Sequence, residues 1–258
     1  MKTIVITGST RGIGFAMANA LLKKGCRVVV SGRKNASVNA AVKRLSETHS
    51  NDQVAGHACD VTSFEDLQQL WDFSVKKFGT IDMWVNNAGI SNELALLPNI
   101  SKEEIREVVE TNILGEIFGT QVALNGFAGI GAGAIYNMEG MGAKKGKMVD
   151  GLSIYGTTKS GLRFFNDAIA QENKNGPILI GALLPGMMLT EMVTNQYEGK
   201  PEDWKRVEKI FDAIAEDVDV VADWMTDKML TNTKNGMRFQ FSNPLKTTLR
   251  MVKMMIQR

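Results

Sequence analysis

The chain opens with a short apolar run that ends in a glycine-rich turn, and this pairing constrains the fold more than any other feature. The run covers residues 3–7, and glycines follow at positions 8, 12 and 14. Glycine permits a tight turn and lets the backbone approach a neighbouring segment closely. Residues 12–24 then have the apolar spacing of a helix. A strand, a tight turn and a helix in this order are the first half of a βαβ unit.

Short β-branched runs alternate with longer amphipathic runs along most of the chain. This alternation predicts an α/β fold, a doubly wound Rossmann-type parallel sheet with helices on both faces. We predict about seven strands, at 3–7, 27–31, 53–58, 81–85, 134–138, 177–184 and 237–241. We predict helices at 12–24, 36–47, 63–77, 101–127 and 153–173. Ser63 and Ser101 are expected N-caps, and Glu104 completes a capping-box pattern after Ser101.

The composition limits which domain organisations and which classes of function are plausible for this chain. The 258 residues are 44% hydrophobic, which suits a single domain over 1–258, and a helical pattern near 186–235 predicts a substrate lid. Lys and Arg total 30 against 28 Asp and Glu, so the charge gives no argument for nucleic acid. We expect neither a signal peptide nor a membrane span. Cys26 and Cys59, each beside a strand pattern, predict buried, reduced thiols in the cytoplasm.

The glycine turn also predicts what the fold binds. Backbone N–H groups at a helix start attract a pyrophosphate, and glycines at 8, 12 and 14 suit the turn that carries them. The first spacing is wider than in the G-x-G-x-x-G fingerprint, so an ordinary glycine-rich loop is the alternative. We expect the turn to hold a dinucleotide through Gly8, Ser9, Thr10, Arg11, Gly12, Ile13 and Gly14.

An arginine stands where a fold that selects NAD usually carries an acid. That acid follows the second strand and binds the ribose 2′-hydroxyl, but this chain has Arg33 there. Arg33 and Arg11 could instead grip a 2′-phosphate by charge-assisted hydrogen bonds, so we expect NADP(H). Solvated loop charges are the alternative. Further coenzyme contacts are expected after the third and fourth strands, at Asp60, Val61, Asn87, Ala88 and Gly89.

A tyrosine and a lysine four residues apart suggest proton transfer. Tyr155 and Lys159 fall one turn apart in the predicted helix 153–173, so both project from one face. A phenol has an ordinary pKa of about 10, and a nearby ammonium would lower it. Tyr155 would then give its proton to a carbonyl oxygen in reduction and accept one in oxidation. A surface Tyr and Lys are the usual meaning of this spacing, so the other motifs carry the argument.

Five motifs in one order resemble the short-chain dehydrogenase/reductase family. They are Thr7-Gly8-x-x-x-Gly12-x-Gly14, Asn86-Asn87-Ala88-Gly89, Asn112, Tyr155-x-x-x-Lys159 and Pro185-Gly186 followed by Thr190. The resemblance implies that Thr190 bonds the nicotinamide carboxamide and that Lys159 holds the nicotinamide ribose. It also implies that Asn87 and Ile113 line the coenzyme cleft, with Pro185 and Gly186 beside it. By the same resemblance Asn112 braces a water that relays protons through Lys159, and the helices at 101–127 and 153–173 build an oligomer.

The serine that this family uses to polarise the substrate carbonyl is missing. By register from Asn137 its position is held by Gly140, preceded by Glu139. A glycine has no side-chain donor, so the contact must come from elsewhere. Three substitutes stay open: a protonated Glu139, a backbone N–H of the loop, or Ser153, which is better explained as a helix N-cap. An ionised Glu139 would disfavour phenolate, so we predict that it is protonated or points toward substrate.

Three stretches, 136–142, 155–163 and 184–191, resemble the chlorophyll(ide) b reductase branch of the family. That resemblance implies NADPH reduction of a formyl group on a chlorin ring to a hydroxymethyl group. Methionines at 187, 188 and 192 would suit a broad apolar substrate, or would simply pack the lid. A catalytically weak NADP(H)-binding sensor or scaffold protein is the alternative function.

Two basic segments suggest partners. The loop 140–152 carries Lys144, Lys145 and Lys147, which could dock acidic substrate groups or face solvent. The pattern at 242–258 is amphipathic and basic, so it could lie on an anionic membrane, although such a helix more often packs against the protein body or a second subunit. We therefore expect a small-molecule carbonyl or alcohol substrate, a homo-oligomer, and neither nucleic acid nor metal.

Overall fold

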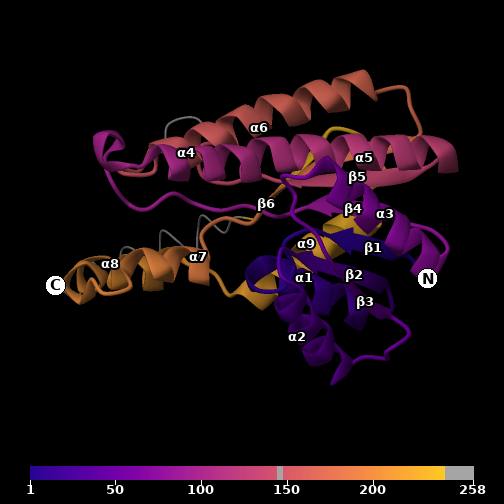
Figure 1. The fold of residues 1–258 in the computed structure, drawn as a ribbon, viewed down its shortest axis with the longest axis horizontal. Helices are drawn as coiled ribbons and strands as arrows, with labels where there is room; N and C mark the ends of the chain where they lie inside the picture. The colour runs from indigo at the N-terminus through magenta and orange to yellow at the C-terminus, as the bar shows by residue number, and fades with distance from the viewer. Residues whose placement is uncertain (144–147, 242–258) are drawn as a thin grey trace.

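The computed structural model describes residues 1–143 and 148–241, and its centre is a seven-stranded parallel sheet (Figure 1). The strands lie in the order β3-β2-β1-β4-β5-β6-β7. Their bounds are β1 Thr3–Ile6, β2 Arg27–Gly32, β3 Val54–Ala58, β4 Met83–Asn86, β5 Gly133–Met138, β6 Ile178–Leu184 and β7 Met237–Gln240. The predicted doubly wound fold is confirmed, and each predicted strand is present within two residues of its expected bounds.

Helices cover both faces of this sheet, with α5 and α6 above it and α1 and α2 below it in Figure 1. One face carries α1 (Gly12–Lys23), α2 (Asn35–Ser46) and α9 (Val218–Thr231). The other carries α3 (Phe64–Phe78), α4 (Lys102–Val109), α5 (Gly115–Ile130) and α6 (Ser153–Glu172). The shorter helices η1, α7 and η3 are Leu97–Asn99, Glu191–Thr194 and Asn195–Tyr197, and α8 is Pro201–Ile214.

Alternate strand residues serve two separate cores. In β1, Ile4 and Ile6 pack with α1 and α9, whereas Val5 packs with α3 and α5. Successive side chains of a strand point to opposite faces, and both faces are covered, so every position of β1 is buried. The central strand β1 is therefore held between two cores.

Side-chain caps define several helix starts. Ser63 and Ser101 each accept a hydrogen bond from the backbone N–H three residues later, as predicted. The predicted capping box does not close, because the Glu104 carboxylate accepts from the backbone N–H of Glu93 instead. The prediction that Ser153 caps its helix is wrong, since Ser153 is the first residue of α6.

The helix predicted at 101–127 contains a π-helical turn. This turn, η2, spans Glu110–Leu114 between α4 and α5. Such turns are frequent at functional sites. By length and composition alone, one described helical run, Lys102–Ile130, could cross a membrane. Here Val122 and Phe127 of that run are buried with α3 and the sheet, as in the core helix of a globular domain.

The segment predicted as a lid divides into two parts. The helices α7 and α8 lie beyond the sheet layers in Figure 1. By contrast, α9 packs against α1 and buries Val221, Met225 and Met229 completely. The lid prediction over 186–235 is therefore wrong for α9, whose apolar side chains complete the core. A lid role for α7 and α8 stays a prediction.

Candidate active site

The strand order reverses between β1 and β4, and in such sheets a ligand crevice lies at the carboxyl ends of the strands. The glycine turn follows β1, and the Asn86–Gly89 turn follows β4. Thr7 joins the two turns, because its hydroxyl accepts hydrogen bonds from the N–H groups of Asn87 at 3.0 Å and Ala88 at 3.1 Å. The Asn87 amide returns a bond of 3.0 Å to the Gly8 carbonyl. Motifs far apart in sequence therefore form one surface.

Glycine is required by geometry in the first turn. Gly8 has a φ of +61°, and a Cβ there would lie only 2.7 Å from the Ala88 Cα. Gly12 has a φ of +56°, yet a Cβ on it would meet nothing within 4 Å, so this side of the turn is open. An open turn at the start of α1 is the cradle that dinucleotide phosphates bind. The residues present therefore fit the phosphates of a dinucleotide.

Ser9 ties the glycine turn to β2. Its hydroxyl donates to the Ile6 carbonyl at 2.6 Å and accepts from the Ser31 N–H at 3.0 Å. Its own N–H donates to the Ser31 carbonyl at 2.8 Å. Ser9 therefore keeps no free donor, because these bonds tie the turn to β2, and its coenzyme contact stays a prediction.

The two arginines expected at a 2′-phosphate are both paired with acids. Arg11 contacts Glu191 of α7 at 2.6 Å, and Arg33 contacts Glu107 of α4 at 3.0 Å. Both arginine side chains are more than half exposed, at 68% and 58%. Exposed ion pairs contribute little, so a phosphate with its greater charge can compete for both guanidinium groups.

The remaining expected coenzyme residues have varied partners. The Asp60 carboxylate accepts from the N–H and the hydroxyl of Thr62, at 3.0 and 2.8 Å. Val61 is buried against α5. Ile113 packs toward α6, and Thr190 is the N-cap of α7. Thr10, Ile13, Pro185 and Gly186 also follow the carboxyl ends of β1 and β6. Their coenzyme contacts stay predictions.

Tyr155 and Lys159 converge on the glycine that replaces the expected serine. A Cβ built on Gly140 would lie 2.5 Å from the Tyr155 hydroxyl oxygen and 3.3 Å from the Lys159 Cγ. A Cβ built on Gly89 would lie 3.7 Å from the Lys159 Nζ. The tyrosine and the lysine therefore occupy one face of α6, at the ends of β4 and β5.

Burial governs the charge of both groups. It raises the pKa of Tyr155 to about 12. It also lowers the pKa of Lys159, an effect that Glu116 and Glu139 oppose. The prediction that Lys159 lowers the pKa of Tyr155 is wrong for this structure, because the loss of water outweighs any attraction between the two. The phenol is protonated at neutral pH, which is the form that donates a proton.

Asn112 lies in the π-turn and binds three segments together. Its Oδ1 accepts from the Ile90 N–H at 2.8 Å, and its Nδ2 donates to the Ile90 carbonyl at 2.9 Å and the Thr158 hydroxyl at 3.0 Å. The amide thereby fixes η2 against the loop after β4 and against α6. The structure brings Asn112 beside Gly89, close to the Lys159 Nζ. Its predicted water relay stays a prediction.

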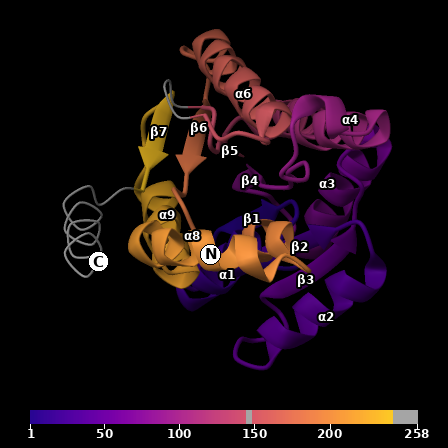
Figure 2. The same ribbon diagram turned by 90° about the vertical axis from the view of Figure 1, so that its left-hand side faces the viewer.

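Glu139 is held in an ion pair. Its carboxylate accepts from the Arg238 guanidinium at 2.8 and 2.9 Å, and from Asn166 at 3.2 Å. Arg238 lies in β7, at the sheet edge in Figure 2, and also contacts Asp167 at 2.9 Å. The prediction that Glu139 is protonated or points toward substrate is wrong, because Arg238 neutralises it. The sequence signal was a lone arginine inside the last strand.

Asn92 is a site residue that the sequence analysis missed. It is fully buried, and its Oδ1 accepts from the Tyr155 N–H at 3.0 Å. Its Nδ2 donates to the Gly151 carbonyl at 2.8 Å. Asn92 therefore satisfies the start of α6 in place of Ser153 and fixes the backbone of Tyr155. It lies 63 residues before the tyrosine, so local capping rules could not find it.

Two sequence expectations lie outside the described residues. These are the lysines at 144, 145 and 147 and the basic segment at 242–258.

Both cysteines are free and buried, as expected. Burial raises the pKa of the Cys59 thiol to about 12, so it is inert toward ordinary redox chemistry.

The chain is similar in sequence to known proteins. A family model described as short chain dehydrogenase matches residues 2–201. The probable chlorophyll(ide) b reductase NYC1, chloroplastic, of Arabidopsis thaliana is 32% identical over 273 residues, covering 100% of this chain and 54% of that protein. The chain thus spans about half the length of this relative.

Solved structures agree with the sequence comparison. An actinorhodin polyketide ketoreductase variant with NADPH has a TM-score of 0.80 at 26% identity, covering 93% of this chain and 95% of that one. A 3-ketoacyl-(acyl-carrier-protein) reductase from Brucella melitensis, complexed with NADH, has a TM-score of 0.78 at 24% identity, with coverage of 92% and 96%. The chain belongs to the short-chain dehydrogenase family of oxidoreductases.

Proposed function

We propose that the protein is an NADP(H)-dependent reductase that converts a carbonyl group to an alcohol, and that its substrate is the formyl group of a chlorin such as chlorophyll(ide) b. The observation that carries this proposal is the placement of Tyr155. Its hydroxyl lies over Gly140 and beside Lys159, at the carboxyl ends of the central strands. A neutral phenol in this place can donate a proton to a carbonyl oxygen.

Different residues of the chain would have different roles in this reaction. The open turn at Gly12 and the start of α1 would hold the phosphates, and Lys159 would hold the nicotinamide ribose. A reduced nicotinamide held there would supply the hydride that the carbonyl carbon needs. Tyr155 gives its proton to the carbonyl oxygen, which completes the alcohol and leaves a phenolate. Regaining that proton from the Lys159 side restores Tyr155.

The preference for NADP(H) rests on charge at the crevice. Arg33 stands where an NAD enzyme would usually place an acid, and Arg11 lies in the neighbouring turn. Related structures hold NADPH in one case and NADH in another. The preference is therefore argued from the arginines of this chain alone, since a guanidinium binds a phosphate through two parallel hydrogen bonds.

The chlorin substrate is supported by the relative and by the surface beside the crevice. The similar Arabidopsis thaliana protein bears the name of a chlorophyll(ide) b reductase. In this chain Leu189 and Met192, next to Thr190, are exposed apolar side chains. Gly140 carries no side chain, and the Tyr155 hydroxyl fills the space that one would need. An open, apolar approach suits a broad and rigid aldehyde.

The decisive experiment follows NADPH oxidation by its near-ultraviolet absorbance with a panel of aldehydes and ketones that includes chlorophyllide b. We expect turnover of chlorophyllide b, and we expect Tyr155→Phe to abolish it while NADPH still binds. Turnover of small ketones alone would keep the reductase and reject the chlorin. Binding of NADPH without turnover of any compound would favour the sensor or scaffold.

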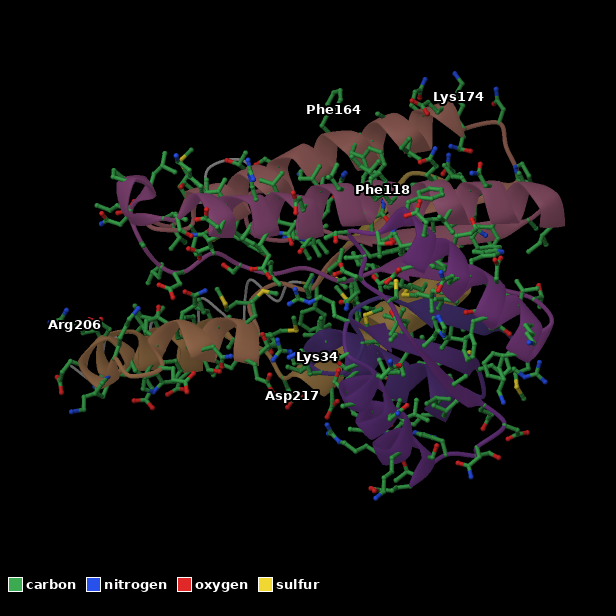
Figure 3. The ribbon with its side chains drawn as sticks, viewed as in Figure 1. Lys34, Phe118, Phe164, Lys174, Arg206 and Asp217 are labelled. Carbon is green, nitrogen blue, oxygen red and sulfur yellow. The ribbon has the colours of Figure 1, made fainter. Side chains whose placement is uncertain are left out.

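We also propose a homo-oligomer formed through the layer of α4, α5 and α6. Phe164 is 77% exposed and points away from the body of the protein in Figure 3. Val109 and Leu114 are further exposed apolar residues of the same layer. Light scattering should show that Phe164→Glu lowers the molecular mass of the particle in solution.

A cytoplasmic location is proposed because both cysteines are free thiols, and a fluorescent fusion tests it.

A further inference from the structure

Three consecutive residues at the end of β5 support both catalytic side chains. The Lys159 Nζ donates a hydrogen bond to the Met138 carbonyl at 2.8 Å. Two residues later the Tyr155 hydroxyl packs against Gly140, where a Cβ would lie 2.5 Å from the phenol oxygen. Glu139 stands between these two contacts. A movement of the Glu139 backbone would therefore displace the support of the lysine and the support of the phenol together.

The sheet itself holds only the first part of this segment. β5 ends at Met138, and the Glu139 N–H still donates to the Leu183 carbonyl of β6 at 2.9 Å. The Gly140 carbonyl then accepts from the Ala143 N–H at 3.1 Å, so the chain turns away from the sheet at this glycine. The Glu139 side chain is fully buried. Its partners therefore provide the next point at which the strand end can be held.

Arg238 of β7 is the charged partner that holds Glu139. Its Nε and Nη2 donate to the carboxylate at 2.9 and 2.8 Å, and such paired bonds fix both the place and the angle of the acid. Asn137, Ala182 and Arg238 lie in one row across β5, β6 and β7. The middle residue of this row is small, which lets the arginine side chain cross β6 to reach Glu139.

The same guanidinium also binds the helix that carries the catalytic residues. Asp167 of α6 accepts from the Arg238 Nη2 at 2.9 Å, and the neighbouring Asn166 donates to Glu139 at 3.2 Å. Asn166 follows Lys159 by seven residues, about two helical turns, so both side chains project from one face of α6. The strand end and the helix are therefore connected to each other through one arginine.

We propose that Arg238 is a positioning residue for Lys159 and Tyr155, and that it acts by holding Glu139, and with it the strand end 138–140, against α6. The proposal rests on the proposed reductase, in which Tyr155 gives a proton to the carbonyl oxygen. A guanidinium suits this task because it is planar, stays charged and makes two parallel hydrogen bonds to a carboxylate. An ammonium in its place would supply the charge without fixing the angle.

The test needs a variant that lacks the ion pair but still folds. Arg238→Met alone leaves a buried carboxylate unpaired, so it is combined with Glu139→Gln, which removes both charges. The glutamine keeps an oxygen that can accept from Asn166. Urea unfolding checks that the double variant is folded. Arg238→Lys is the second variant, since it keeps the positive charge but not the two parallel hydrogen bonds.

Two measurements follow in each variant. With NADPH and the carbonyl compound that the unmodified protein reduces, kcat of the double variant should fall by about 10- to 100-fold while KM changes by less than about threefold. In the coenzyme-free protein with 15Nζ-labelled lysine, the Lys159 signal is assigned by its loss in Lys159→Arg. Hydrogen exchange of this ammonium should become about tenfold faster or more, because its bond to Met138 opens more often. Arg238→Lys should show intermediate changes.

Lys24→Met is the matched control. The Lys24 side chain is 21% exposed, against 22% for Arg238, and it too contacts two acids, of which Asp227 lies at 3.0 Å. Lys24 joins the end of α1 to α9 on the opposite face of the sheet. Its loss should leave both kcat and the exchange of the Lys159 ammonium unchanged.

An unchanged kcat in the folded double variant would overturn the proposal, because the ion pair would then serve stability alone. A lower kcat with unchanged exchange of Lys159 would overturn it as well, since the effect would not pass through the lysine. If the double variant does not fold, Arg238→Lys decides by the same two measurements. Faster exchange in a protein that turns over no compound would keep the positioning role and reject the reductase, and turnover with unchanged exchange would do the reverse.

Discussion

The hydroxyl of Tyr155 occupies the space that a side chain at Gly140 would need. A Cβ there would lie 2.5 Å from the phenol oxygen, closer than real Cβ contacts allow. The neighbouring Lys159 Cγ would be 3.3 Å away, so the clash could not be relieved by moving toward the lysine. Glycine at this position and the buried setting of the phenol are therefore one structural feature.

Gly140→Ala should reduce turnover by about 10- to 100-fold, because a displacement of about 1 Å in a reacting group has effects of this size. NADPH binding, measured by fluorescence, should change little. Gly156→Ala is the matched control, since a Cβ on this neighbour of Tyr155 would meet nothing within 4 Å. Full activity in Gly140→Ser would show that the tyrosine acts from another position.

The raised pKa of Tyr155 predicts different pH profiles for the two directions. Reduction uses the protonated phenol, which predominates at every pH well below about 12. Reduction should therefore show no loss from phenol ionisation at neutral pH. Oxidation uses the phenolate, so its rate should rise by about tenfold per pH unit in this range. Initial rates in both directions test this, and a plateau in oxidation near pH 7 would contradict it.

Sequence periodicity predicted the sheet well because the central strands, such as β1 and β4, are buried on both faces and flanked by turn residues. The family resemblance predicted that Tyr155, Lys159, Asn112 and the two turns belong to one site, and the carboxyl ends of parallel strands lie together at one edge of the sheet. Sequence periodicity failed at Glu139, whose partner Arg238 arrives from the other end of the chain. The sequence also predicted the wrong direction for the pKa of Tyr155. Residue spacing identifies the neighbouring Lys159, but it does not show that burial removes water from the phenol.

The arginine pairs predict how coenzyme choice can be changed. Arg33→Ala should weaken NADPH binding by about tenfold or more and leave NADH binding nearly unchanged, because only NADPH carries the 2′-phosphate. Glu107→Gln should tighten NADPH binding by a few-fold at most, since it frees Arg33 from a weak exposed pair. Arg206→Ala, an exposed arginine of α8, is the control. Equal losses of affinity for NADPH and NADH in Arg33→Ala would show that Arg33 does not bind a 2′-phosphate.

The ion pair between Glu139 and Arg238 predicts a large effect on stability. Arg238→Met leaves a fully buried carboxylate without its partner, and the free energy of unfolding should fall by about 3 to 5 kcal/mol. Urea unfolding followed by circular dichroism measures it. Arg206→Met, which breaks an exposed pair with Asp203, should change little. Equal stability of the two variants would mean that the buried pair is not formed in solution.

The hydrogen bond from the Tyr155 N–H to Asn92 predicts that loss of Asn92 lowers both stability and activity. Asn92→Ala removes the acceptor of the Tyr155 N–H, so the free energy of unfolding should fall by about 1 to 2 kcal/mol. Turnover should fall as well, because the first turn of α6 carries the phenol. Asn92→Asp keeps the acceptor and should retain more of both than the alanine variant.

The control for this cap lies at the other end of the same helix. Asn173 donates to the Ile169 carbonyl at 2.9 Å, so Asn173→Ala removes one hydrogen bond of α6 far from the site. It should lower stability slightly and leave kcat unchanged, as urea unfolding and NADPH oxidation would show. If Asn92→Ala lost stability but kept full kcat, the cap would hold the fold without positioning the tyrosine. Tyr155 would then owe its place to the packing over Gly140.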